Sequence, residues 1–312
     1  MKTKILISYR EKHHLIRSEV LTPIQTGCAL TDEHFPHMLR DDVGENISAR
    51  NDSYCELSAQ YWAWKNYAAL GEPDYVGFMH YRRHFMFDGW RGNPEWVWLT
   101  NGHVYFVPCV TPEYLEHLSD SLIEEQLRDC DCIVLKPYDV AHLHSLSVRE
   151  QYAKLPGQRA EWFDILIEEL SRLHPDYAEA IRRVQCGSVQ YLCNMFIMQK
   201  ELFFEYCEFC FSTLEAVDRR VNSKGLNDQE IRFLGYLGEF CLTVFLFHLR
   251  SRGARIKELE GSYILADEPV RHPGLLYAFY RIMCKVTFGR TRRRFKEKRR
   301  SMRALRRFFR TP

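Results

Sequence analysis

The chain has 312 residues, 46% of them hydrophobic and 27% charged, which suits one large α/β domain or two small ones. Its 16 glycines and 12 prolines exclude a collagen-like or wholly disordered chain. No run of 18 consecutive apolar residues occurs, so we expect no membrane-spanning helix. The first ten residues lack the apolar stretch of a signal peptide, so we expect a cytoplasmic protein.

The net charge of +2 conceals an uneven distribution of charge along the chain. Residues 281–312 carry fourteen Lys and Arg against one acid, Glu297, whereas the rest of the chain holds 29 basic and 40 acidic residues. An acidic body with a strongly basic tail indicates an anionic partner for the tail, such as lipid or nucleic acid.

Short apolar segments alternate with helical patterns along the chain. Residues 10–50 are polar and weakly periodic, which predicts a long loop with short elements. The alternation predicts an α/β fold with a mostly parallel sheet covered on both faces, whose ligands bind at the carboxyl ends of the strands. The predicted strands are 4–8, 75–79, 132–135, 194–198 and a short one near 263–265; the predicted helices are 56–69, 112–128, 161–173, 200–217 and 228–249.

Four basic side chains follow the apolar strand at residues 75–79: His80, Arg82, Arg83 and His84. They stand where such a sheet places phosphate-binding groups, and the guanidinium group is a rigid fork of donors matched to phosphate oxygens. Two arginines here would neutralise a diphosphate without a metal ion. The alternative is a solvated charged turn.

Glu239 is the one acid in the apolar segment 234–249. A helix that is apolar all round is buried, and a buried carboxyl group is either paired or has a raised pKa. Such groups often serve in acid–base chemistry or ligand binding. The alternative is a structural ion pair with an arginine.

Other acidic and histidine side chains are candidates by their position after a strand. Asp139, His142 and His144 follow the predicted strand 132–135. The sequence Asp129-Cys130-Asp131 is a DxD pattern, but it precedes that strand, where a metal-holding DxD would follow one. We therefore expect no metal cofactor, with Mn²⁺ or Mg²⁺ at this DxD as the disfavoured alternative.

The absence of several known motifs argues against some classes of protein. The chain lacks GxxxxGK[ST], a GxGxxG after a strand, and GxSxG, which argues against P-loop NTPases, Rossmann dehydrogenases and α/β-hydrolases. Eleven cysteines include one CxxC, Cys207 and Cys210, with no second pair and no nearby histidine. We expect these two to be buried free thiols rather than metal ligands.

The basic tail has an apolar stripe, formed by Phe295, Met302, Leu305 and Phe309 at helical spacing. A basic amphipathic helix suits an anionic bilayer surface, where each basic residue contributes roughly 1 kcal/mol. RNA binding and a disordered tail are the alternatives. Because the aromatic residues share one stripe, we favour a membrane over a nucleic acid.

Four sequence blocks resemble a bacterial family found in capsule and O-antigen gene clusters, whose members are described as domains of unknown function or as glycosyltransferases. The resemblance spans roughly residues 3–265. Members commonly have arginine after the final glutamate, where this chain has Phe240. The blocks are NISARNDSYCELSAQYWAWKN (46–66), DYVGFMHYRRHF (74–85), CNMFIM (193–198) and RFLGYLGE (232–239).

The resemblance implies a nucleotide-diphospho-sugar transferase with a single GT-A-like domain. Some relatives are associated with galactofuranose transfer, so UDP-galactofuranose is a candidate donor among the UDP-sugars. The strand ending in HYRR takes the place of the usual DxD strand, so Arg82 and Arg83, flanked by His80 and His84, would hold the donor diphosphate.

The same resemblance suggests roles for further residues. Glu239 is the first choice of base for a single displacement with inversion, and Asp139 is the second. The residues expected to line the donor or acceptor site are Tyr81, Asn194, Asp228, Trp64 and His144. Trp64 shares a helix with Tyr61 and Trp62, and burial of all three in the core is the alternative.

These inferences give a membrane-associated glycosyltransferase, with a GT-A-like domain at residues 1–270 and a basic amphipathic tail at 271–312. It would act on a lipid-linked glycan acceptor in surface polysaccharide synthesis, as a peripheral protein on the inner face of the cell membrane. Two other functions compete with this one: a non-catalytic assembly protein that binds glycan or lipid carrier, and an RNA-binding protein that uses the tail.

Overall fold

The computed structural model describes residues 1–89, 97–99, 104–143 and 145–264. His144 and the basic tail, residues 271–312, lie outside the described residues, so the interpretations placed on them stay predictions.

A central sheet organises the protein, in the order β3–β2–β1–β4–β11–β8–β12. Neighbours pair in parallel except β11, which runs antiparallel to both β4 and β8. The predicted α/β fold with a mostly parallel sheet is confirmed. These strands are β1 (Thr3–Tyr9), β2 (Leu21–Gln25), β3 (Leu39–Arg40), β4 (Tyr75–His80), β8 (Cys132–Leu135), β11 (Phe196–Gln199) and β12 (Ile256–Leu259).

A second group of strands extends from the end of β4. A hairpin joins β4 to β5, which pairs antiparallel with β13, and β13 pairs in parallel with β7. A separate two-stranded sheet pairs β9 with β10. The bounds are β5 (Arg83–Phe85), β6 (Val97–Leu99), β7 (Val104–Val107), β9 (Tyr138–Asp139), β10 (Val189–Gln190) and β13 (Gly261–Ile264).

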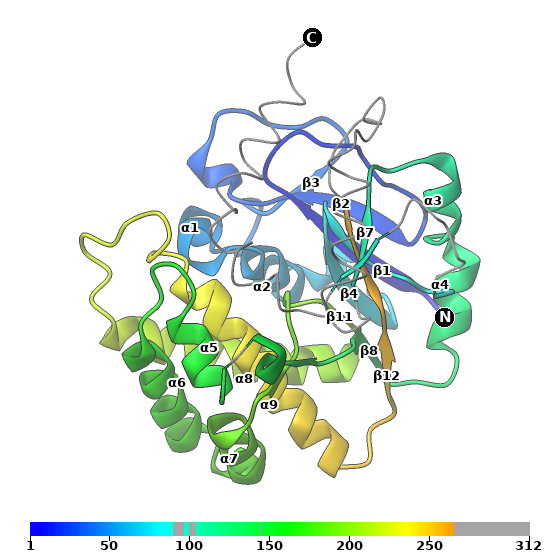
Figure 1. The fold of residues 1–312 in the computed structure, drawn as a ribbon. Coiled ribbons are helices and arrows are strands. Elements are labelled where there is room, and N and C mark those ends of the chain that lie inside the picture. The colour runs from blue at the N-terminus through cyan, green and yellow to red at the C-terminus, as the bar shows by residue number, and fades with distance from the viewer. Residues whose placement is uncertain (90–96, 100–103, 144, 265–312) are drawn as a thin grey trace, which may run out of the picture.

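Helices cover both faces of the sheet, with α3 and α4 on one side and α5–α9 on the other (Figure 1). Alternation along the strands divides the core: Leu6 and Phe78 pack with the α8–α9 layer, whereas Ile7 and Met79 pack with α3 and α4. The helices are α1 (Asn51–Tyr54), α2 (Leu57–Lys65), α3 (Pro112–Glu116), α4 (Asp120–Leu127), α5 (Val148–Ala153), α6 (Ala160–Leu173), α7 (Ala178–Cys186), α8 (Lys200–Arg220) and α9 (Phe233–Ser251).

The structure differs from the prediction mainly in residues 10–50, expected to be a loop. This segment supplies β2 and β3, two parallel strands beside β1. Strand β2 contains Pro23, which argues against an interior strand, and β3 has only two residues. The predicted helix at 112–128 is two helices, α3 and α4.

Helix α9 is the central helix of the larger core. Among the described residues, α9 is the one helix that is both long enough and apolar enough to cross a membrane. However, 78% of its most apolar 18-residue stretch is buried inside the protein. A core helix of a soluble protein has the same composition. The expected burial of the two closely spaced thiols is confirmed, since Cys207 and Cys210 on the adjoining α8 are fully buried.

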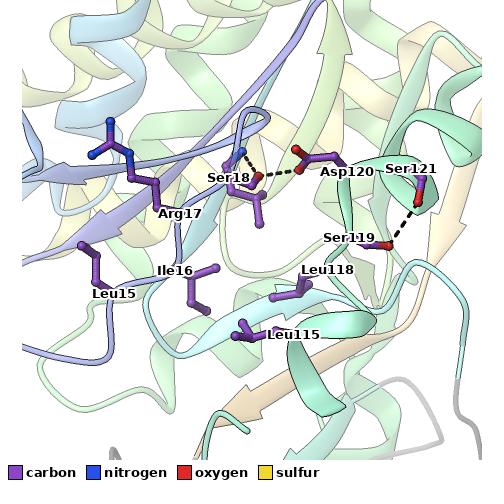
Figure 2. A pocket seen from close by; sticks show the side chains of 10 residues that line it. Leu15, Ile16, Arg17, Ser18, Leu115, Leu118, Ser119, Asp120 and Ser121 are labelled. Atoms are coloured by element: carbon purple, nitrogen blue, oxygen red, sulfur yellow. Dashed lines mark hydrogen bonds between the residues drawn. The ribbon is translucent and has the colours of Figure 1, made fainter. Parts of the chain in front are cut away.

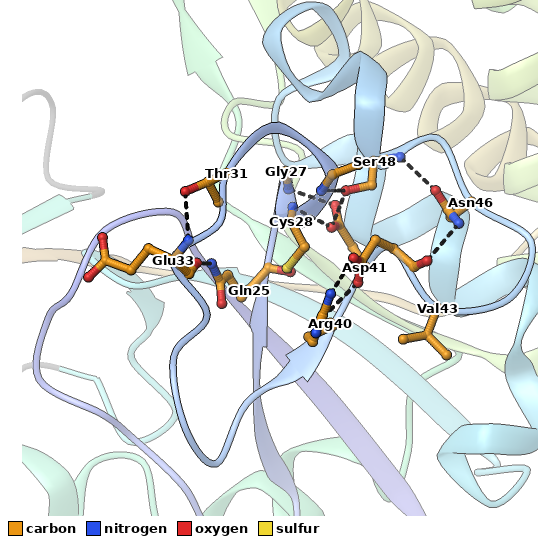
Figure 3. Close-up of polar contacts among 12 residues, drawn as sticks. Gln25, Gly27, Cys28, Thr31, Glu33, Arg40, Asp41, Val43, Asn46 and Ser48 are labelled. Atoms are coloured by element: carbon orange, nitrogen blue, oxygen red, sulfur yellow. Dashed lines mark hydrogen bonds and ion pairs between the residues drawn. The ribbon is translucent and has the colours of Figure 1, made fainter.

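A buried carboxylate ties the segment after β2 to helix α2. Asp41 is fully buried and accepts hydrogen bonds from the backbone N–H groups of Gly27 and Cys28, at 2.9 and 3.0 Å, and from the hydroxyl of Ser48 at 2.6 Å (Figure 3). The Ser58 hydroxyl on α2 donates to it at 2.8 Å. Four donors compensate the cost of burying this charge.

Candidate active site at the end of strand β4

Strand β4 delivers His80 and Arg83 to the carboxyl edge of the sheet. His80 pairs with Arg83 across a two-residue turn, Tyr81-Arg82, so both positions are fixed by the hairpin. The alternation that points Phe78 toward the α8–α9 layer places His80 on the same face. There His80 Nε2 lies 2.7 Å from the backbone oxygen of Cys193.

The loop that leads into β11 carries Cys193 and Asn194, both with left-handed backbone conformations. Their φ angles are 73° and 49°, which side-chain-bearing residues adopt rarely. Asn194 is fully buried; its Nδ2 donates to the Gly235 carbonyl at 2.9 Å and to Glu56 Oε1 at 2.8 Å. Strained backbone of this kind is typical of functional sites.

Glu239, the acid predicted from the apolar segment, meets this loop. Its Oε1 accepts the backbone N–H of Cys193 at 2.7 Å. Two glycines let helix α9 come close enough: a Cβ on Gly235 would lie 2.9 Å from the sulfur of Cys55, and one on Gly238 would lie 2.6 Å from a methyl carbon of Leu57. The GYLGE block is therefore a close-packing surface that ends in the carboxyl group of Glu239.

The environment of Glu239 changes its acidity. Burial raises the pKa of Glu239 to about 8, and the negative charge of Glu56 also raises it, whereas the Cys193 N–H, Arg83 and Arg232 lower it. Burial likewise lowers the pKa of His80, which favours the neutral ring. A carboxyl group that titrates near neutrality is suited to take up a proton from a hydroxyl group.

Arg83 brings a positive charge to the same cluster. Its pKa is raised, most strongly by the neighbouring Cys193 and also by Tyr263, Glu56 and Glu239. The guanidinium lies over the Tyr263 ring, 5.4 Å from its centroid. Although two carboxyl groups are near, no residue in the described part of the chain forms an ion pair or hydrogen bond with this guanidinium. Its donors therefore have no acceptor among the described residues.

Glu56 belongs to this cluster, and the sequence analysis did not single it out. It lies directly before α2 and follows Cys55, whose φ of 52° and ψ of −130° bend the chain between α1 and α2. In the sequence Glu56 is a polar residue at a helix start, where acids are common. The departure from helical backbone at Cys55 leaves no sequence signal, because cysteine is not a residue that marks such turns.

The two arginines of the HYRR block have different neighbours. Arg82 lies over the ring of Tyr81, 5.0 Å from its centroid, and Tyr81 stacks on His13 at 4.0 Å. Only Arg83 reaches the cluster of His80 and Glu239 through the contacts described above.

His84 occupies an interior position. It is fully buried, and its Nδ1 lies 2.7 Å from the hydroxyl of Tyr114, which in turn lies 2.5 Å from the Ser262 hydroxyl. Burial lowers the pKa of His84 to about 3, so the ring is neutral. A neutral, enclosed ring is a structural link between β5, α3 and β13.

The remaining predicted residues lie elsewhere. Asp139 sits in the β9–β10 sheet, where it accepts the backbone N–H of Ala141 at 2.9 Å. Asp228 is exposed in the loop between α8 and α9. The Trp64 ring stacks on Phe211 of α8 with centroids 5.9 Å apart, which agrees with the core alternative. Asn194, by contrast, is in the cluster.

The DxD sequence lies at the amino end of β8, away from the carboxyl edge. Asp131 pairs with Arg255 at 2.7 Å, and this partner lowers the pKa of the Asp131 carboxyl group. No three His, Cys, Asp or Glu side chains gather in the manner of a metal site within the described ranges. The groups at the β4 edge, with two arginines, Arg83 and Arg232, and two partly buried carboxyl groups, suit an anion beside a polar neutral ligand.

A surface depression of about 460 Å³ lies elsewhere, between the segment 15–21 and helices α3 and α4 (Figure 2). Leu115 and Leu118 line it, and the Ser18 hydroxyl donates to Asp120 at its rim. The depression adjoins Leu21, at the amino end of β2, whereas His80 lies at the opposite edge of the sheet. Its lining has no paired catalytic groups, so we place the candidate site at the β4 edge.

The sheet order and the flanking helices define a GT-A-like α/β protein with its polar cluster at the carboxyl edge. A solved structure supports this class: the apo structure of WbbM, a bifunctional glycosyltransferase, is similar to this chain with a TM-score of 0.78 and 28% identity. The similarity covers 88% of this chain and 48% of WbbM, so this chain spans about half the length of that protein.

Residues 4–250 match the family described as Domain of unknown function (DUF4422), and the chain belongs to that family. No curated protein matches the chain.

Proposed function

We propose that the protein is a glycosyltransferase that moves a sugar from a nucleotide-diphosphate donor to a hydroxyl group of a glycan acceptor. The observation that carries the proposal is the proximity of the Arg83 guanidinium to Glu239, a carboxyl group of raised pKa, at the carboxyl edge of a GT-A-like sheet. The similarity to WbbM supports the same class of reaction.

In this mechanism Glu239 is the base. Its carboxylate accepts the proton of the acceptor hydroxyl as that oxygen attacks the anomeric carbon, and the bond from the anomeric carbon to the diphosphate oxygen breaks with its electron pair on the phosphate. One displacement inverts the anomeric configuration. The products are the glycosylated acceptor and the nucleoside diphosphate.

Arg83 would stabilise the charge that develops on the leaving diphosphate, since the hairpin fixes its backbone position beside the cluster before substrate binds. Arg82, beside Tyr81 on the turn, is the second candidate contact for the donor. Neither role requires a divalent cation, so we propose metal-independent transfer. The donor we propose is a UDP-sugar, with UDP-galactofuranose as a specific candidate from the family resemblance.

The acceptor and the location form a separate part of the proposal. The stripe of apolar residues among the basic residues of 281–312 supports binding to an anionic membrane surface. A lipid-linked glycan at the inner face of the cell membrane would then be within reach. Surface polysaccharide synthesis, as in capsule or O-antigen, is the process that uses such acceptors.

A donor screen tests the proposal. The protein is heated in the presence of UDP-, GDP-, dTDP- and CMP-sugars, and unfolding is followed by differential scanning fluorimetry. A donor present at 100 times its Kd adds about 2.7 kcal/mol to the free energy of unfolding, so one nucleotide class should raise Tm. Release of the nucleoside diphosphate from that donor then distinguishes an enzyme from a non-catalytic binding protein.

Two results would contradict the proposal. One is a protein whose Tm responds to no nucleotide sugar. The other is a protein that binds a donor but never releases nucleoside diphosphate, with or without a glycan acceptor. Salt-sensitive retention of RNA in place of liposome binding would instead favour the RNA-binding alternative.

A further inference from the structure

The loop before β11 holds two carboxyl groups. The backbone N–H of Cys193 donates to Glu239 Oε1 at 2.7 Å, and the side-chain amide of the next residue, Asn194, donates to Glu56 Oε1 at 2.8 Å. Glu56 comes from the start of α2 and Glu239 from α9. Two elements far apart in the sequence are thus aligned on one dipeptide.

Each carboxyl group keeps one oxygen available. Throughout the described ranges no residue donates a hydrogen bond to Oε2 of Glu56 or of Glu239. Neither oxygen is among the fully buried polar atoms that lack a partner, and both side chains are partly exposed. The loop therefore fixes one oxygen of each carboxyl group and leaves the other without a hydrogen-bond partner among the described residues.

This arrangement is maintained at a cost in stability. Cys55, Cys193 and Asn194 all have positive φ, at 52°, 73° and 49°, and each such residue costs of order 1–3 kcal/mol. The buried Asn194 Oδ1 also lacks a hydrogen-bond partner. These unfavourable features lie directly beside Glu56 or Glu239, which indicates that the placement of both carboxyl groups is functional.

We propose that Glu56 is a second substrate-binding residue, whose carboxylate accepts hydrogen bonds from hydroxyl groups of the acceptor sugar next to the hydroxyl that Glu239 deprotonates. The inference rests on the proposed glycosyl transfer and adds to it the residue that orients the acceptor. A carboxylate repels the anionic diphosphate but pairs well with the neighbouring hydroxyl groups of a neutral sugar. Arg83 lies near both acids. In this proposal Arg83 binds the diphosphate, and the two acids act on the neutral acceptor sugar.

Glu56 also influences the base directly. The groups that act on Glu239 are Glu56, which raises its pKa, and Cys193 N–H, Arg83 and Arg232, which lower it, all added to the effect of burial. Removing the charge of Glu56 should therefore lower the pKa of Glu239. Its carboxylate form would then persist to lower pH.

The test compares transfer to sugars with transfer to water. Wild-type protein and the Glu56→Gln variant are given the donor found in the screen, with a panel of octyl glycosides of galactose, glucose, mannose and N-acetylglucosamine, or with no acceptor. Glutamine retains an oxygen for the Asn194 amide. The matched control is Glu124→Gln, on the exposed face of α4.

We expect Glu56→Gln to lower kcat/KM for the preferred glycoside about 10- to 100-fold, as for the loss of a hydrogen bond to a charged group. Hydrolysis of the donor should stay within about twofold of wild type, and the acidic limb of the pH–rate profile should move to lower pH. Glu56→Asp keeps the charge, so it should lose transfer while leaving that limb in place. The control should match wild type throughout.

Three outcomes would overturn the inference. Unchanged transfer would show that Glu56 does not bind the acceptor. Equal loss of transfer and hydrolysis would assign Glu56 to the donor or to folding, which a parallel Tm measurement would separate. Wild-type hydrolysis without transfer to any glycoside would remove the acceptor role from this cluster. Failure of the proposed function is a different result, in which wild-type protein neither hydrolyses nor transfers any donor.

Discussion

The backbone N–H of Cys193 lies 2.7 Å from Oε1 of Glu239. The loop that leads into β11 therefore holds a carboxyl group of helix α9, 46 residues further along the chain. The contact leaves the second oxygen of Glu239 without a partner in the described residues, and Arg83 and His80 belong to the same cluster, His80 through its contact with the Cys193 carbonyl.

The Arg83→Ala variant should lose transfer about 10²- to 10³-fold in kcat, the effect of removing one preorganised donor to a developing negative charge. Arg83→Lys should recover little, because lysine lacks the planar fork. Steady-state assays with the screened donor measure both. Arg128→Ala, at the exposed end of α4, is the control, and an active Arg83→Ala variant would refute the diphosphate role.

The activity should depend on the ionisation of Glu239. Because its pKa in the free protein is about 8, kcat/KM should rise about tenfold per pH unit up to about pH 8 and level off above it. Glu239→Gln should abolish transfer at every pH. A profile in which kcat/KM is already flat below pH 6 would exclude Glu239 as the base.

The same group should make stability depend on pH. The folded-state pKa of Glu239 is raised from an ordinary value of 4.5 to about 8, so its contribution is present below the unfolded value and is lost as pH rises through about 8. Glu239→Gln should therefore match wild type in Tm at pH 4 and exceed it by roughly a few degrees at pH 9. A lower Tm for the variant at pH 9 would contradict the assignment.

Excess EDTA should leave transfer unchanged, because Arg83 rather than a cation would neutralise the diphosphate. Asp131→Ala, which breaks the DxD and removes the partner of Arg255, should reduce Tm with little effect on kcat. Loss of activity in EDTA, restored by Mn²⁺, would return the metal alternative. The assay with and without Mn²⁺ decides between them.

The Gly235→Ala substitution should damage the site through packing. Its Cβ would come within 3.0 Å of Cys55 Cβ, which costs about 1–3 kcal/mol and pushes the Cys55–Glu56 turn away from α9. We expect a lower Tm and a lower kcat together. Ser251→Ala, at the exposed end of the same helix, should change neither.

Deletion of residues 281–312 should release the protein from anionic liposomes without removing activity on a soluble acceptor. Flotation with and without anionic lipid, at low and high salt, measures the first effect. The donor hydrolysis assay measures the second. Retention of the truncated protein on liposomes would place the membrane contact elsewhere in the chain.

Within the central sheet, the sequence predicted the strands that are continuous apolar runs and missed β2, β3 and β12, which are not. Strands β1, β4 and β8 are continuous apolar runs because helices cover both sides of the sheet. Strand β2 carries Thr22 and Pro23, and β12 carries Lys257 and Glu258, so neither has a periodic signal. Their place in the sheet is decided by pairing with β1 and β8, which a single sequence does not display.

The candidate site was predicted in part. Glu239 was predicted because a single acid in a buried apolar helix must be paired or have a raised pKa. Arg83 was predicted because basic residues follow a buried strand. Nothing in the sequence distinguishes Arg82 from Arg83, but the hairpin gives the two side chains different neighbours. Glu56 was missed because its position depends on Cys55, whose backbone conformation no residue pattern announces.

The buried Asp41 has a consequence for how variants of this protein should be interpreted. Its hydrogen bond to Ser58 reaches the helix that Glu56 precedes, and Ser58 in turn accepts from Asn51, whose amide also donates to the carbonyl of Cys55. Both carboxylate oxygens of Asp41 accept hydrogen bonds. The Asp41→Asn substitution would replace one of these accepting oxygens with an NH2 group, which is itself a donor. Such a substitution, in the turn after β3 and outside the candidate site, should therefore resemble a catalytic defect in a genetic screen.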